Sequence, residues 1–163
     1  MYAKRSVSTR IAKYLFVVII FMGIISSLSL IVMASNKSDA EAINISGSLR
    51  MQSYRLLTEM ERSPDTVEQN LVRYQDSLNA HVLLTVQNQL FAPSGIKASY
   101  QKILQRWMMM SDLASSHQIE KYHAELKSYV QDVDDFVLEL QRFTELKWII
   151  AVSVLCVSML LIL

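Results

Sequence analysis

The chain has 163 residues, room for about one folded domain, and 52% of its residues are hydrophobic whereas only 19% are charged. Its net charge of +1, with basic residues scattered rather than clustered, argues against a nucleic-acid-binding domain. The only cysteine, Cys156, excludes an intrachain disulfide, so the chain must be held together by packing.

Two uncharged apolar runs predict membrane spans. Residues 14–33 are long enough as a helix to cross a hydrocarbon core about 30 Å thick. Residues 148–163 form a second run that is still apolar where the sequence ends, so we expect a truncated second span and a longer natural protein. Val32-Met33-Ala34 also fits a signal-peptide cleavage site, but the first run exceeds the usual apolar length of about 7 to 15 residues.

The distribution of charge predicts the orientation of these spans. Residues 1–13 contain four basic and no acidic residues, whereas residues 34–147 contain the other basic residues and all 15 acidic ones. The positive-inside rule places both ends of the chain in the cytoplasm. Residues 34–147 are then expected to form a periplasmic domain on a bacterial inner membrane.

The periplasmic segment is expected to be all-α. The first span is predicted to continue without a breaker into a helix ending near Arg62, because Ser63-Pro64-Asp65 disfavours further helix. Apolar spacing predicts a second helix over residues 66–89 and a third over 96–114, separated by Ala92-Pro93-Ser94-Gly95.

A sustained 3.5-residue repeat predicts the fourth helix, which begins at Ile119 and continues into the second span. Its members are Ile119, Tyr122, Leu126, Tyr129, Val133, Phe136, Leu140 and Phe143. Short connections make neighbouring helices antiparallel, so we expect an antiparallel four-helix-bundle sensor domain flanked by two transmembrane helices.

The first helix of the bundle has two distinct faces between Asp39 and Leu57. One face is expected to be core, and its members are Ile45, Leu49, Gln52, Leu56 and Met60. The other includes Ile43, Ser46, Gly47, Arg50, Tyr54 and Leu57. A glycine inside a helix costs roughly 0.5 to 1 kcal/mol relative to alanine, so Gly47 needs a compensating reason.

Arg50 has no acidic residue three or four positions away in either direction. Its planar guanidinium is suited to binding oxyanions, and Gly47 would let a ligand or a second backbone approach. The alternative is an ion pair with an acidic residue on another helix. Spacing alone leaves both interpretations open.

No catalytic, metal or cofactor site is predicted. His81, His117 and His123 have no partners at the spacing of a metal site or a catalytic triad. Trp107-Met-Met-Met110 suggests a soft-metal site, but consecutive helical side chains diverge by about 100° and are better explained as core. The sequence also lacks a glycine-rich phosphate loop.

The contiguous stretch from Asp39 to Leu56, DAEAINISGSLRMQSYRL, resembles the periplasmic recognition box of the nitrate/nitrite-responsive sensor histidine kinases of the NarX and NarQ group, closer to its NarQ branch. Outside this stretch the resemblance is one of layout. The resemblance implies a homodimer in which Arg50 of each subunit binds nitrate, or nitrite, between the two copies, with Gly47 nearby. Ser46 and Tyr54 are added as members of the same face.

The resemblance also implies cytoplasmic signalling and kinase domains after residue 163, which would act on a response regulator. This chain itself is not expected to be an enzyme. Two other functions remain open: a chemotaxis-type receptor with the same layout, and a membrane-anchored structural or assembly protein without a small ligand.

Overall fold

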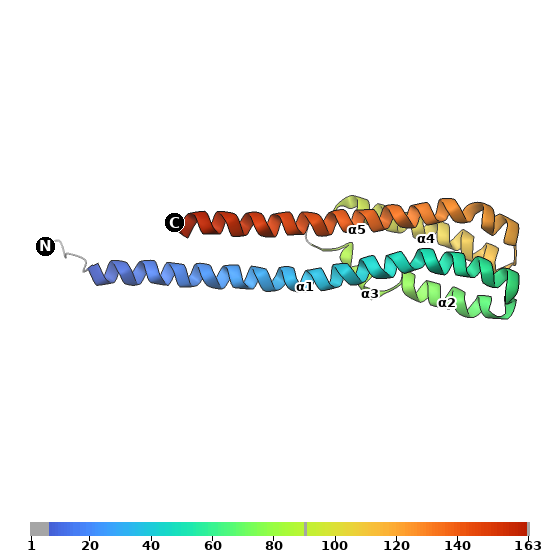
Figure 1. Cartoon of the computed structure of the whole chain (residues 1–163), viewed down its shortest axis with the longest axis horizontal. Helices are drawn as coiled ribbons and strands as arrows, with labels where there is room; N and C mark the ends of the chain where they lie inside the picture. The colour runs from blue at the N-terminus through green and yellow to red at the C-terminus, as the bar shows by residue number, and fades with distance from the viewer. Residues whose placement is uncertain (1–6, 90, 163) are drawn as a thin grey trace. The chain divides into compact units, whose positions relative to one another are not determined.

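The computed structural model describes residues 7–89 and 91–162, and within these residues the protein is entirely helical (Figure 1). The elements are α1 (Val7–Arg62), the 3-10 turn η1 (Pro64–Thr66), α2 (Val67–Leu78), α3 (His81–Val86), α4 (Ser94–Ser115) and α5 (Ile119–Ile162). The all-α prediction is therefore confirmed.

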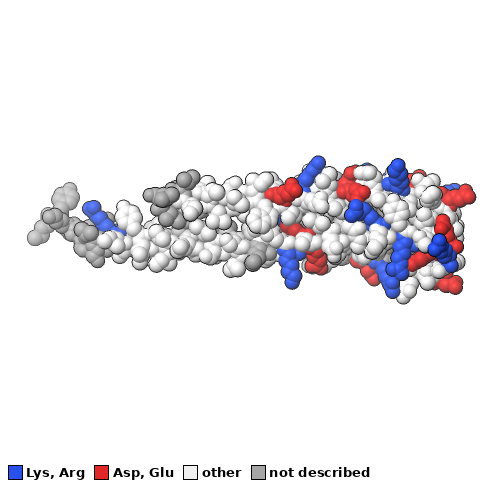
Figure 2. All heavy atoms as spheres, viewed as in Figure 1, with Lys and Arg blue, Asp and Glu red and all other residues white. Residues whose placement is uncertain are grey.

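The chain divides into two compact units, which we call the bundle unit, Lys37–Glu145, and the apolar unit, formed by the residues on either side of it. In the apolar unit, Lys147 Nζ donates a hydrogen bond to Ser35 Oγ at 2.8 Å. Charged side chains gather over the bundle unit, whereas the apolar parts of the two long helices are almost free of them (Figure 2).

Among the described residues, α1 is the one helix long and apolar enough to cross a membrane. No residue in the most apolar part of this helix is buried. The end of α5 from Trp148 is uncharged, but a second span stays a prediction.

The two long helices are continuous, as expected. α1 extends over 56 residues and has no proline, and Pro64 follows its end. α5 extends over 44 residues, and every predicted member of its 3.5-residue repeat from Tyr122 to Phe143 is buried, while Ile119 is partly buried. The predicted stripe of α4 is also buried: Ile96, Tyr100, Ile103, Trp107 and Met110.

The predicted second helix is interrupted, so a continuous helix over residues 66–89 is wrong. α2 ends at Leu78, and Ala80 adopts an extended conformation with φ −54° and ψ 133° before α3 begins. The side chain of Tyr100 in α4 donates to the Leu78 carbonyl at 2.7 Å, which satisfies an acceptor that the break leaves free. The break lets Val82, Leu83 and Val86 of α3 reach the core together.

The buried stripe of α1 differs from the predicted one at two of its five members. Ile45 and Gln52 are only half-buried, and the buried members in the bundle are Asp39, Ala42, Ser46, Leu49, Ser53, Leu56 and Met60. The two serines occupy core positions because each hydroxyl donates to the carbonyl four residues earlier, to Ala42 and to Leu49, at 2.7 Å. Their small size leaves room for large aromatic side chains.

Three buried tyrosines form a hydrogen-bonded cluster beside Ser53. Tyr74 and Tyr129 share a hydrogen bond between hydroxyls at 2.7 Å, and Tyr122 donates to the Ser53 carbonyl at 3.0 Å. Tyr74 also stacks on Trp107 with ring centroids 3.7 Å apart. Burial raises the pKa of Tyr74 to about 12 and raises the pKa of Tyr122 and Tyr129 as well.

A buried acid joins α4 to α5. Asp132 is 5% exposed and accepts Lys102 Nζ at 2.7 Å and Arg106 Nη1 at 2.8 Å. Arg106 also donates to Glu125 at 2.9 Å and to Ser128 at 2.8 Å. This network fixes the register of the two helices because the buried carboxylate is paired and hydrogen-bonded.

Candidate functional site: an arginine beside a glycine on α1

Arg50 projects from α1 in the bundle unit and forms an ion pair with Asp134 of α5. Its Nη1 lies 2.7 Å from Asp134 Oδ1, and the two side chains are 46% and 39% exposed. Its Nε makes a long contact of 3.5 Å with the Gly47 carbonyl. Of the two interpretations that spacing left open, the described protomer therefore shows the ion pair with another helix.

The Arg50–Asp134 ion pair is weak enough for a ligand to replace the Asp134 carboxylate. Ion pairs between partly exposed side chains contribute about 0 to 1 kcal/mol, because solvent screens the attraction and both side chains lose freedom. Only Nη1 of the guanidinium is used by the carboxylate. The rest of the planar group remains available to a ligand that approaches from solvent.

Gly47 has no packing reason within the protomer. A methyl group built at this position would meet only Arg50 Nη2, at 3.7 Å, which is an ordinary van der Waals distance. Alanine would therefore fit and would favour the helix by roughly 0.5 to 1 kcal/mol. The missing side chain leaves space at this position for a ligand or for the backbone of a second protomer.

The other two predicted site residues are placed differently. Tyr54 is 50% exposed and lies one turn after Arg50, as expected. Ser46 is fully buried, and its hydroxyl is used by the Ala42 carbonyl. The prediction that Ser46 shares the exposed face of Arg50 is wrong, because the buried stripe includes it.

Gly47, which is half-buried, lies in a stripe of α1 whose other members are exposed. The members of this stripe repeat at alternating spacings of four and three residues and are Ala40, Asn44, Gly47, Met51, Tyr54 and Thr58. Met51 is 68% exposed, although it is a large apolar side chain. Residues three and four apart lie on the same side of a helix, so these six positions form one face of α1, separate from the buried stripe.

Asp134 was missed by the sequence analysis. It is 84 residues from Arg50, and α5 carries three acids at positions 132, 134 and 135, so spacing does not single it out. The structure separates them: Asp132 is buried against α4, and Asp134 faces Arg50.

No metal site is found in the part of the chain that the structure describes, since no three histidine, cysteine or acidic side chains converge there. The three histidines are exposed. Met110 of the methionine run is buried, whereas Met108 and Met109 are exposed. The side chains of the run do not converge, as helical geometry predicted. The expectation that the run belongs to the core is correct for Trp107 and Met110 and wrong for Met108 and Met109.

Residues 31–129 match the family described as PilJ, type IV pili methyl-accepting chemotaxis transducer N-term. Over its full 163 residues the chain is 63% identical to a protein of Haemophilus influenzae named sensor protein NarQ homolog. It is also 33% identical over 154 residues to the nitrate/nitrite sensor protein NarQ of Escherichia coli.

These matches cover 100% and 94% of the chain, but only 29% and 27% of the two relatives. The chain therefore spans less than a third of the length of these curated relatives. What it shares with them is their N-terminal sensory region.

Proposed function

Since the chain belongs to the family described as the N-terminal part of type IV pili methyl-accepting chemotaxis transducers, we propose that it is a transmembrane sensor module whose ligand is nitrate, or nitrite. The similarity to two NarQ sensors supports this ligand, because the name of the Escherichia coli relative specifies nitrate and nitrite. The single observation that carries the proposal is the exposed Arg50 guanidinium lying over a glycine that the protomer does not require.

The proposed binding unit is a homodimer. Two copies of α1 pack along the exposed stripe that contains Gly47, which brings Arg50 of each protomer toward the same axis. Two facing guanidiniums repel each other, and one planar anion between them removes that repulsion while it accepts charge-assisted hydrogen bonds from both. Gly47 permits the close approach, and Tyr54 borders the site.

Binding of the anion competes with Asp134. In the described protomer the Arg50 guanidinium links α1 to α5 through this acid. An anion that takes over the guanidinium weakens that link in both protomers. The ligand thereby favours a different placement of α1 relative to α5, and the two continuous helices carry the change along the chain.

The size of the ligand limits the energy of the switch. Nitrate has four heavy atoms, and a ceiling of about 1.5 kcal/mol per atom gives about 6 kcal/mol, or a Kd of some tens of micromolar. Moving a two-state equilibrium from 1:99 to 99:1 requires about 5.5 kcal/mol of differential binding. The two placements of the helices must therefore be close in energy without ligand.

The wider setting of the module is part of the same proposal. Residues 14–33 and 148–163 cross a bacterial inner membrane, residues 34–147 lie in the periplasm, and the tail formed by residues 1–13 is cytoplasmic. The signal passes to a cytoplasmic histidine kinase region, which the relatives have room for beyond the matched third, and from there to a response regulator. The chain itself binds the anion and transmits the signal toward the kinase region.

The test is the substitution Arg50→Lys, which keeps the positive charge but removes the fork of donors. We expect nitrate affinity, measured by calorimetric titration of the chain in lipid nanodiscs, to fall at least tenfold while helicity and thermal midpoint stay unchanged. Arg62→Lys, on the same helix and exposed, is the matched control. An unchanged nitrate affinity in Arg50→Lys would contradict the assignment of Arg50.

A chemotaxis-type receptor is the second candidate, because the description of the matched family names a methyl-accepting chemotaxis transducer. The natural sequence after residue 163 separates the two: a kinase core supports the first proposal, and a methyl-accepting helical hairpin supports the second. A structural or assembly protein is the third, and it predicts that nitrate stabilises the chain no more than chloride does.

A further inference from the structure

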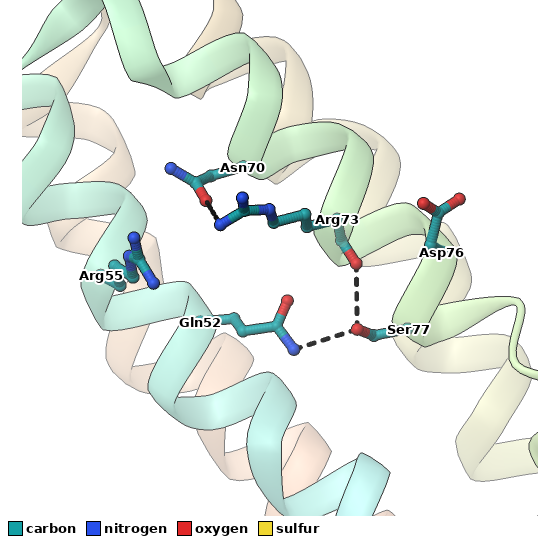
Figure 3. A pocket seen from close by; sticks show the side chains of 6 residues that line it. All are labelled: Gln52, Arg55, Asn70, Arg73, Asp76 and Ser77. Carbon is teal, nitrogen blue, oxygen red and sulfur yellow. Dashed lines mark hydrogen bonds between the residues drawn. The ribbon is translucent and has the colours of Figure 1, made fainter.

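A polar groove lies between α1 and α2, within the bundle unit. It has a volume of about 310 Å³ and is lined by Gln52 and Arg55 of α1 and by Asn70, Arg73, Asp76 and Ser77 of α2 (Figure 3). All six side chains are polar or charged. A volume near 300 Å³ is at the lower limit for small-molecule sites and far exceeds what one nitrate ion fills.

Two guanidiniums border this groove with unused donors. Arg55 is held through its Nε, which lies 2.7 Å from Glu59 Oε1, so its two terminal nitrogens have no partner among the described residues. Arg73 makes only a long contact of 3.5 Å with Asn70 Oδ1 and has no ion pair among those residues. The groove therefore offers guanidinium groups from both helices.

The side chains of Gln52 and Ser77, which also line the groove, already form hydrogen bonds with protein groups. Gln52 Nε2 donates to Ser48 Oγ and to Ser77 Oγ, each at 3.1 Å, which uses both of its amide hydrogens. Ser77 donates in turn to the Arg73 carbonyl at 2.9 Å. These bonds fix α1 against α2 without using the guanidiniums, so a ligand can bind without a new arrangement of the walls.

The charge of the groove favours an anion. Glu59 balances Arg55, and its other oxygen accepts the Asn70 amide. Asp76 lines the groove and forms no ion pair among the described residues, but its carboxylate points away from the space between the helices (Figure 3). Arg73 extends toward α1 and forms no ion pair among the residues that the structure describes (Figure 3).

We propose that this groove binds a small molecule carrying a carboxylate or a phosphate group, held by the guanidiniums of Arg73 and Arg55. Both groups present delocalised oxygens that match the planar fork of arginine. The groove is separate from the Arg50 site, because five residues along a helix at about 100° each turn Arg55 roughly 140° away from Arg50. This site does not depend on the proposed nitrate function.

The test uses succinate and inorganic phosphate as probes, titrated at constant ionic strength against chloride, with the full chain in lipid nanodiscs. The readouts are calorimetry and the NMR signals of the arginine Nε–H groups. We expect one probe to bind with a Kd on the order of 1 mM and to shift the signals of Arg55 and Arg73. Arg73→Gln should weaken that binding at least tenfold.

The controls separate this site from the one at Arg50. Arg62→Gln removes an exposed arginine of α1 outside the groove, and Arg50→Lys disables the proposed nitrate site; both should leave the affinity for the bound probe unchanged. Arg73→Lys keeps the charge and should weaken binding less than Arg73→Gln.

Each result decides the proposal. Succinate binding that depends on Arg73 supports an organic carboxylate as the ligand class, and phosphate binding that depends on Arg73 supports a phosphate. No binding of either probe at 20-fold above the expected Kd, on the order of 20 mM, overturns the proposal. An equal loss of binding in Arg62→Gln also overturns it, because the effect would then be one of overall charge.

Discussion

Arg50 Nη1 and Asp134 Oδ1 lie 2.7 Å apart and join α1 to α5 across a partly exposed surface. The pair links two helices through residues that are 84 positions apart in the sequence. A link that is both weak and placed on the proposed ligand-binding arginine can be broken by a ligand of few atoms.

Asp134→Asn should tighten nitrate binding by about fivefold, since it removes a competitor for Arg50 that contributes up to about 1 kcal/mol. The free energy of unfolding should change by no more than about 1 kcal/mol for the same reason. Calorimetric titration measures the first quantity and thermal unfolding the second.

The matched control is Asp135→Asn, which removes the neighbouring exposed carboxylate, a partner of Gln131 rather than of Arg50. Equal tightening in both variants would show that general charge, and not competition for Arg50, governs the affinity.

Gly47→Ala should have opposite effects on the stability of the protomer and on the formation of the dimer. Within the protomer the added methyl group meets only Arg50 Nη2 at 3.7 Å, so the helix should gain roughly 0.5 to 1 kcal/mol of stability. If α1 packs closely against a second copy at this position, dimerisation and nitrate affinity should both fall. Analytical ultracentrifugation in detergent and calorimetry measure these two effects.

Gly95→Ala provides a contrast for this experiment. A methyl group at Gly95 would lie 2.8 Å from Glu139 Oε2, so a flexible side chain of α5 would have to move within the protomer. Its effect should therefore appear in unfolding and not in dimerisation. If dimerisation and nitrate binding were both unchanged in Gly47→Ala, that result would contradict close packing of two copies of α1 at Gly47.

Arg106→Leu should destabilise the bundle by about 2 kcal/mol, because it removes one of the two cations that compensate the buried Asp132 carboxylate. Lys102 retains its contact with the same carboxylate and limits the loss. Thermal or denaturant unfolding measures the change.

Arg142→Leu is the matched control, since Arg142 forms an exposed pair with Glu139 three residues away. It should change stability by less than about 0.5 kcal/mol. Similar losses in the two variants would mean that the Asp132 network is no more important than a surface pair.

The buried tyrosines predict loss of stability in alkali. Burial raises the folded-state pKa of Tyr74 to about 12, above the value of 10.0 for an ordinary tyrosine. The folded state therefore holds the phenolic proton more tightly than the unfolded state does. The resulting stability is fully present below pH 10 and is lost as the pH rises from 10 toward 12.

This slope is measured as the thermal midpoint between pH 8 and pH 12. Tyr74→Phe should be less stable at pH 8 by about 1 kcal/mol, because it breaks the hydrogen bond to Tyr129, but its midpoint should fall less steeply above pH 10. A parent midpoint that does not fall between pH 10 and 12 would refute the prediction.

The sequence predicted the α4 and α5 stripes correctly because a 3.5-residue repeat of large apolar side chains has one stable outcome, burial against other helices. On α1 the same reasoning chose Ile45 and missed Ser46 and Ser53. Choosing core positions by apolar character fails on α1. A small polar residue such as Ser53 can occupy the core beside Tyr74 and Tyr122, because its hydroxyl donates to a carbonyl of its own helix.

The sequence also did not predict the break between α2 and α3. Asn79 and Ala80 carry no strong breaking signal, and residues 66–89 read as one periodic segment. The tertiary structure decides the break, because it satisfies the Leu78 carbonyl through Tyr100 and buries three side chains of α3. Tertiary contacts of this kind override local helix propensity.

The sequence by itself determined the helical class, the apolar run of residues 14–33, the continuity of the two long helices, and Arg50 with Gly47 as a pair without a local explanation. These follow from interactions over a few residues, which periodicity and spacing record. Only the tertiary structure decided which acid among Asp132, Asp134 and Asp135 faces Arg50, and that Ser46 is buried. Both depend on how helices far apart in sequence are rotated against each other, and that rotation is set by the packing of the whole core.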